Sequence, residues 1–141
     1  MNWLAYAILA ASSFGFYNFF TKISADKFSP ALANIFIAGT SLLVAIISTI
    51  YLKMSGQSLI FTKGSLILPI MAGLFTGVAE IFYLSMYSKN APITVGNPLV
   101  VGGTIVIAVI LGIIILKEPM NTARIAGIIF VITGLVLLTR S

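Results

Sequence analysis

The amino-acid sequence predicts an all-α integral membrane protein with five transmembrane helices. Hydrophobic residues make up 60% of the 141 residues and charged residues only 8%, whereas soluble domains carry roughly a quarter charged residues. The charged side chains are too few to cover the surface of a soluble domain of this length. Charges and turn-forming residues also divide the chain into five apolar blocks, each close to the roughly 17–25 residues that a helix needs to cross a bilayer.

The blocks are expected as five spans of a single domain that covers residues 1–141. Helices are favoured over strands because the blocks are long and apolar almost all round, without a sustained period of two. Pro30, Pro92 and Pro119 stand where helices are expected to begin, since a proline at the first helical position gives up no hydrogen bond. The longest link is expected between the second and third spans. In chain order, the expected spans are about 3–20, 31–52, 66–87, 93–116 and 120–138.

Composition excludes several classes of function. The chain has no His and no Cys, which removes the ligands of common zinc, haem and iron–sulfur sites and the base of Ser–His–Asp and Cys–His catalysis. No second buried acid and no nucleophile–base pair is visible, so the sequence predicts neither an enzyme nor a metal or cofactor. The basic residues stand singly between apolar runs, which indicates ends of membrane spans and not a nucleic-acid partner.

Charge counting gives no preferred orientation in the membrane. With five spans the two termini lie on opposite sides, and the eight Lys and Arg residues then divide four against four. The positive-inside rule therefore has no bias to act on. One interpretation is that a small bias or the N-terminal amine sets a single orientation; the other is insertion in both orientations, giving an antiparallel dimer. Those on the side of the N-terminus are Lys53, Lys63, Lys117 and Arg124; those on the other side are Lys22, Lys27, Lys89 and Arg140.

Glu80 is the most informative residue, because it is an acid inside the third apolar block. It lies nine residues before Lys89, which is about 13 Å along a helix and so within the hydrocarbon region. An ionised carboxylate there costs at least several kcal/mol, and such residues commonly mark substrate or ion pathways. We therefore predict that Glu80 binds a substrate or a proton. The alternative is a hydrogen bond to a Tyr or Asn that only fixes helix packing.

Four further residues are secondary candidates for this site. Asn18 lies on a polar stripe of the first span, and Tyr83 shares the helical face of Glu80. Asn97 and Pro98 precede two glycines in the fourth span, a pattern typical of broken helices that line transporter cavities. A plain proline kink explains Pro98 equally well, and ordinary packing explains a tyrosine such as Tyr83.

Glycines indicate where helices approach one another closely. Gly73 and Gly77 form a small-xxx-small pair on the face of Glu80. Gly127 and Gly134 stand one heptad apart in the last span. We expect all four to serve helix packing.

Two stretches of the chain resemble EamA-type members of the drug/metabolite transporter superfamily. One is the closing segment, in which a short turn carrying a Glu precedes a terminal helix with two glycines; the other is the junction of the third and fourth spans. Together they cover about 60 residues. The matching runs are Leu111-Gly112 through Leu116-Lys117-Glu118-Pro119, Ile125-Ala126-Gly127-Ile128-Ile129, Gly134-Leu135-Val136-Leu137-Leu138, Phe82-Tyr83-Leu84-Ser85, Asn90-Ala91-Pro92 and Asn97-Pro98-Leu99.

The resemblance implies a transporter subunit that moves a small metabolite or drug-like solute by alternating access, with proton coupling as one form of it. Ten-span relatives contain two inverted five-helix repeats, so a single unit is expected to form a homodimer, parallel or antiparallel, or a heterodimer with a related unit. The expected location is the plasma (inner) membrane of a prokaryote. The four-span relatives use a Glu in their first helix, which this chain lacks, so the role of Glu80 is not carried over from them. The alternative function is a non-transporting accessory or assembly subunit, and the substrate stays open.

Overall fold

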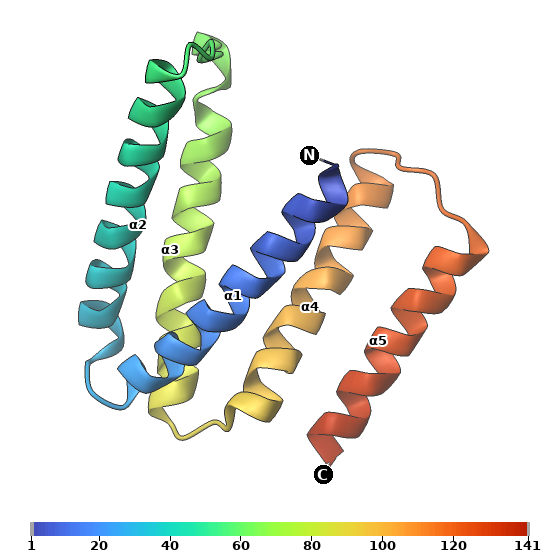
Figure 1. Ribbon diagram of the computed structural model, residues 1–141. Helices are drawn as coiled ribbons and strands as arrows, with labels where there is room; N and C mark the ends of the chain where they lie inside the picture. Colours follow the sequence, from blue (N-terminus) through green and yellow to red (C-terminus); the bar gives the residue numbers. More distant parts are fainter. Residues whose placement is uncertain (1, 141) are drawn as a thin grey trace. The chain divides into compact units, whose positions relative to one another are not determined.

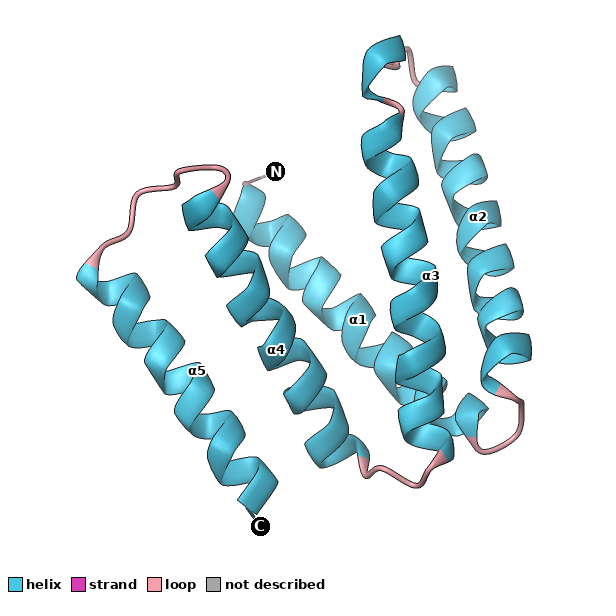
Figure 2. Ribbon diagram, turned by 180° about the vertical axis from the view of Figure 1, so that it is seen from behind, coloured by secondary structure: helices cyan, strands magenta, loops and turns pink. Residues whose placement is uncertain are grey.

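The structure, a computed structural model, describes residues 2–140 and consists of helices joined by links (Figure 1). No strand occurs in this described range (Figure 2). A short 3₁₀ turn, Lys63–Ser65, precedes the third long helix. The all-helical fold class and the five helices predicted from the sequence are confirmed. The helices are α1 Trp3–Ala25, α2 Pro30–Met54, α3 Ile67–Ser88, α4 Ile93–Ile114 and α5 Thr122–Arg140.

Four of the five helices are long and apolar enough to cross a membrane. These are α1 to α4, each with 22 to 25 residues. In α5 the apolar stretch, Thr122–Leu138, is shorter. Most of the large apolar side chains on the helices are exposed to the surroundings of the chain. In water such a surface would be unstable, so this surface suits acyl chains or other protein subunits.

The first helix is longer than the membrane span expected within it. The expected span covers about residues 3–20, and α1 continues past Lys22 to Ala25. Lys22 donates to Asp26 one turn later, with Nζ and Oδ1 3.1 Å apart. A long lysine stem can lie along apolar surface while its charged end reaches a polar region. A single Lys therefore does not end this helix.

The three prolines stand at or just before the starts of helices. Pro30 is the first residue of α2, and Pro92 directly precedes α4. The last span was expected to open between Pro119 and Thr122, and α5 begins at Thr122. The side-chain oxygen of Asn121 accepts a hydrogen bond from the Arg124 N–H at 2.9 Å, which is the N-cap arrangement that starts a helix.

The chain divides into two compact units, one with α1, α2 and α3 and the other with α4 and α5. In the first unit α3 packs against both α1 and α2, and α2 runs antiparallel to α3 (Figure 1). In the second unit α4 packs against α5, with Gly102 of α4 against the side chain of Leu135. A single domain over the whole chain stays a prediction.

The tightest packing of the first unit lies where α1 ends, α2 begins and α3 ends. Leu84 and Tyr87 of α3 are fully buried there, at 0% exposure. The other buried residues of this region are Thr21, Ala25, Ala33 and Tyr83. The opposite ends of α1 and α2 contribute no buried residue within the described range. The three helices are therefore held together chiefly at one end.

Candidate functional site

A pocket of about 450 Å³ lies among the three helices of the first unit. Its volume is within the range of about 300–1,000 Å³ that is typical of small-molecule sites. Aromatic and aliphatic side chains make up part of its wall, and polar groups make up the rest. Phe14 and Tyr17 come from α1; Asn34, Ile37, Ala38 and Ser41 from α2; and Gly73, Thr76, Gly77 and Glu80 from α3.

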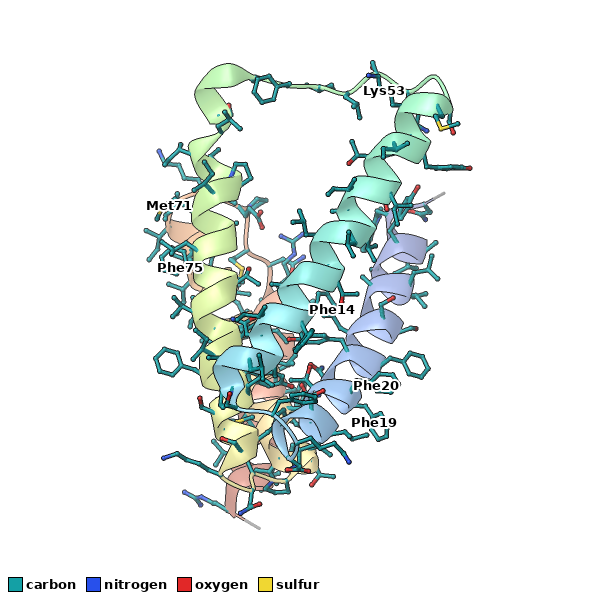
Figure 3. All side chains as sticks on the ribbon, turned by 90° about the vertical axis from the view of Figure 1, so that its left-hand side faces the viewer. Phe14, Phe19, Phe20, Lys53, Met71 and Phe75 are labelled. Atoms are coloured by element: carbon teal, nitrogen blue, oxygen red, sulfur yellow. The ribbon has the colours of Figure 1, made fainter. Side chains whose placement is uncertain are left out.

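The wall formed by α1 is aromatic. Phe14 and Tyr17 are three residues apart, which puts both rings on one helical face. The rings meet edge to face, with centroids 6.3 Å apart and an interplanar angle of 83°. Figure 3 shows Phe14 pointing toward the neighbouring helices, whereas Met71 and Phe75 of α3 point away from α2. The pocket therefore has two ring surfaces set nearly at right angles.

The wall formed by α3 combines small residues with one acid. Gly73, Thr76, Gly77 and Glu80 follow the three–four spacing of one helical face. The Thr76 hydroxyl donates to the Ala72 carbonyl at 2.9 Å, so its hydrogen is used within the helix. The missing side chains at positions 73 and 77 leave room in front of Glu80.

Asn34 connects the α2 wall to the α3 wall. Its Nδ2 donates a hydrogen bond to the Gly77 carbonyl oxygen at 3.3 Å. A glycine leaves this carbonyl accessible, since no side chain covers it. The bond fixes the separation of α2 and α3 at the pocket, three residues along α3 from Glu80.

Two polar atoms in the pocket lack partners. The Tyr17 hydroxyl lies near enough to the Glu80 carboxyl to interact with its charge. However, among the described residues neither this hydroxyl nor Glu80 Oε2 has a hydrogen-bond partner of acceptable geometry, and both atoms are screened from solvent. Buried polar atoms are nearly always bonded to protein, water, an ion or a ligand. An unsatisfied pair on two residues that line a cavity is therefore a candidate point of ligand attachment.

A cluster of hydrogen-bonded side chains, which we call the tyrosine cluster, joins α1 to α3 beside the pocket. It consists of Asn18, Tyr83 and Tyr87. The Tyr83 hydroxyl donates to Asn18 Oδ1 at 3.0 Å and lies 2.9 Å from the Tyr87 hydroxyl. Because the Tyr83 hydrogen is used on Asn18, Tyr87 is the donor of the second bond. Lys22 Nζ lies 5.7 Å from the centroid of the Tyr87 ring, within range of a cation–π interaction.

The structure separates the predicted site residues into three places. Glu80 lines the pocket. Asn18 and Tyr83 bond each other in the tyrosine cluster. Asn97 and Pro98 lie half-buried on α4 in the second unit. α4 continues through Pro98 from Ile93 to Ile114, so the interrupted helix considered from the sequence is not observed.

At none of the four packing glycines does a neighbouring helix occupy the place of the missing side chain within the described chain. A Cβ atom built at Gly73, Gly77, Gly127 or Gly134 would meet no described atom within 4 Å, apart from those of its own helix turns. Their role in packing stays a prediction that concerns other subunits. At Gly102, one of the two glycines that follow Asn97 and Pro98, a Cβ would overlap a neighbouring side chain, that of Leu135.

Three residues of the pocket, Phe14, Tyr17 and Asn34, are not among the site residues predicted from the sequence. Phe14 and Tyr17 recur with Thr21 at three and four residues on α1, and this periodicity was the available signal for a protein-facing stripe. Asn34 connects two helices, since its amide on α2 bonds the Gly77 carbonyl on α3.

A second pocket of about 360 Å³ adjoins the first between α1 and α2. The two share Tyr17, Ile37 and Ser41 as lining residues. The second pocket extends along α1 to Ser24, one residue from the end of that helix. The Glu80 pocket is thus adjoined by open space that leads toward the link between α1 and α2.

Long apolar helices with an exposed apolar surface, together with one sequestered acid in a solute-sized pocket, define an integral membrane protein with a candidate site for a small molecule. No group of three or more potential metal ligands occurs in the described part of the chain. The EamA-like transporter family matches residues 1–140, and the chain belongs to this family of membrane transporters within the drug/metabolite transporter superfamily. Comparison with curated proteins and with solved structures gives no match.

Proposed function

We propose that the pocket among α1, α2 and α3 binds the small solute that this transporter carries. The single observation that carries the proposal is that Glu80 and Tyr17, whose Oε2 and hydroxyl atoms are unsatisfied and screened from solvent, both line a cavity of about 450 Å³. A group that bears the cost of burial without a structural partner is better explained by binding than by packing. In this proposal Glu80 binds the solute or a proton in turn.

The proposed working unit is a pair of five-helix chains in the plasma membrane of a prokaryote. Two such chains, identical or related, would supply the ten helices of the larger transporters. Rigid-body rocking of one chain against the other would then expose the pocket to each side of the membrane alternately. The abundant exposed apolar surface of the chain supports a second protein subunit as well as lipid.

The test is solute flux in liposomes containing purified protein, driven by a pH gradient. For Glu80→Gln we expect loss of at least tenfold of the flux driven by the gradient, because Gln keeps the size of the side chain but cannot exchange a proton. Glu118→Gln is the matched control, since Glu118 is an exposed acid in the α4–α5 link, and it should retain flux. Circular dichroism would verify that both variants keep their helices.

Unchanged flux in Glu80→Gln would overturn the coupling role of this acid. If the wild-type chain moves no solute and instead co-purifies in fixed ratio with a different membrane protein, the accessory-subunit function replaces carriage.

A further inference from the structure

We infer that the solute bound at this pocket is a protonated organic amine, with at least one N–H and an apolar body. The inference rests on the proposed function, because it names the chemical class that the same pocket selects. Four features carry it: the charge of the wall, the unsatisfied atoms, the ring surfaces and the apolar remainder.

The charge of the pocket wall favours a cation. Glu80 is ionisable and acidic, and none of the ten described lining residues carries a positive charge. The nearest base along α1 is Lys22, five residues beyond Tyr17, and it is paired with Asp26. Glu80 is half-buried with its Oε2 atom screened from solvent. A carboxylate screened in this way without a cation is costly, and a bound ammonium supplies the missing charge. An anionic solute would add a second negative charge and be repelled.

The two unsatisfied atoms favour an amine that carries N–H groups. Glu80 Oε2 and the Tyr17 hydroxyl oxygen are both able to accept a hydrogen bond, and the two residues line the same cavity. An ammonium has several N–H donors and can bond both atoms at once, with the stronger, charge-assisted bond going to the carboxylate. A quaternary ammonium carries the charge without any N–H, so it would leave both acceptors unsatisfied.

The remaining surface of the pocket matches the rest of such a molecule. The Phe14 and Tyr17 rings, at 83° to one another, offer π-faces that attract a cation. Ile37, Ala38 and Gly73 provide an apolar surface for a hydrocarbon or aromatic body. Charge, donors and apolar body are thus all matched within one pocket.

The experiment compares four solutes that share one body and differ at one end. They are 4-phenylbutylamine, its trimethylammonium analogue, the neutral 4-phenylbutanol and the anionic 4-phenylbutyrate. Affinity for the purified protein in detergent is measured by calorimetry at pH 7.5. We expect the amine to bind at least tenfold more tightly than the alcohol and the quaternary analogue, with no measurable binding of the carboxylate. Equal or tighter binding of the alcohol or carboxylate, or no binding of the amine, would overturn the inference.

Variants locate the preference at the two unsatisfied atoms. Glu80→Gln should abolish the tenfold preference for amine over alcohol, and Tyr17→Phe should reduce the preference for amine over quaternary ammonium. Glu118→Gln should leave both preferences intact. A preference that survives in Glu80→Gln would place amine recognition elsewhere and contradict the inference.

Liposome flux separates failure of this inference from failure of the proposed function. Tight amine binding without flux of any of the four solutes would retain amine recognition but overturn carriage. Flux of the alcohol that equals flux of the amine, and that still depends on the pocket, would retain carriage but overturn the amine class.

Discussion

The Tyr83 hydroxyl connects α3, which carries Glu80, to α1, which carries Tyr17. Tyr83 lies one turn beyond Glu80 on α3, and its hydroxyl bonds Asn18 on α1 and Tyr87 on its own helix. The fully buried Tyr87 ring also lies under the Lys22 ammonium. These contacts set where α1 lies against α3 and therefore where Tyr17 faces Glu80. The tyrosine cluster positions the site without lining the pocket.

Removing this one hydroxyl should loosen α1 from α3. Tyr83→Phe loses the bond to Asn18 and the acceptor for Tyr87, and hydrogen bonds between membrane helices contribute about 0.6–2 kcal/mol each. We expect the free energy of unfolding in detergent to fall by about 1–2 kcal/mol. Titration with a denaturing detergent, followed by circular dichroism, measures it.

The matched control for this variant is Tyr51→Phe, since Tyr51 on α2 is 68% exposed. It should change stability by less than about 0.5 kcal/mol. If both tyrosine variants unfold alike, the tyrosine cluster contributes nothing specific to the first unit.

For single residues, the sequence identifies Glu80 as a site residue more readily than it identifies the residues around Glu80. Glu80 stands out because a charge inside an apolar run has few explanations. Tyr17 does not, since a tyrosine serves equally as an interfacial anchor, a packing residue or a ligand. Only the three-dimensional arrangement of α1 and α3 distinguishes Tyr17 in the pocket from Tyr83 in the tyrosine cluster.

At the scale of elements, the pairing of α4 with α5 depends on Gly102. A Cβ there would overlap the Leu135 side chain, whereas a Cβ at the adjacent Gly103 would meet no described atom within 4 Å apart from those of its own helix turns. The two neighbouring glycines therefore form a natural matched pair. One permits a close contact, and the other only lowers the helix propensity.

Substitution of each glycine by alanine separates these effects. Gly102→Ala should lower the free energy of unfolding by about 1–3 kcal/mol through overpacking. Gly103→Ala should leave it unchanged or raise it by up to about 1 kcal/mol, since alanine favours a helix. Combining Gly102→Ala with Leu135→Ala should cost less than the sum of the single changes. Additive costs would mean that the two positions do not meet.

The ends of the elements show where sequence reasoning is weakest. The existence of five helices follows from hydropathy, because backbone groups in lipid must bond within their own segment. Hydropathy does not locate the end of α1, because the helix continues past Lys22 to Ala25. It places the start of α5 only between Pro119 and Thr122, whereas the structure shows the cap that starts the helix, the side chain of Asn121.

At the scale of the whole molecule, the equal division of Lys and Arg leads to an expectation about orientation. Cysteines introduced at the exposed positions Ser29 and Gln57, in the α1–α2 and α2–α3 links, would each be unique in a chain without native Cys. If the chain inserts both ways, each cysteine is labelled by an impermeant reagent from both sides of the membrane. Labelling of the two positions from opposite sides only would establish a single orientation.

A variant with added positive charge in one link is the control for the expected insertion in both orientations. Two lysines placed in the α2–α3 link, at Gln57 and Ser58, give the positive-inside rule an asymmetry to act on. The Ser29 cysteine should then be labelled from the outside only. Continued labelling from both sides would show that charge does not determine the orientation.

The one-ended packing of the first unit has a mechanical consequence. The described buried residues of α1 are Thr21 and Ala25, at one end of the helix, so a tilt of α1 would pivot about this end. Trp3 lies eighteen residues from Thr21, which is about 27 Å along the helix. A tilt of about 10° would move Trp3 by about 5 Å and Phe14 by about 2 Å, while Thr21 stays in place. A small tilt of α1 is thus enough to widen or narrow the pocket on the side formed by Phe14.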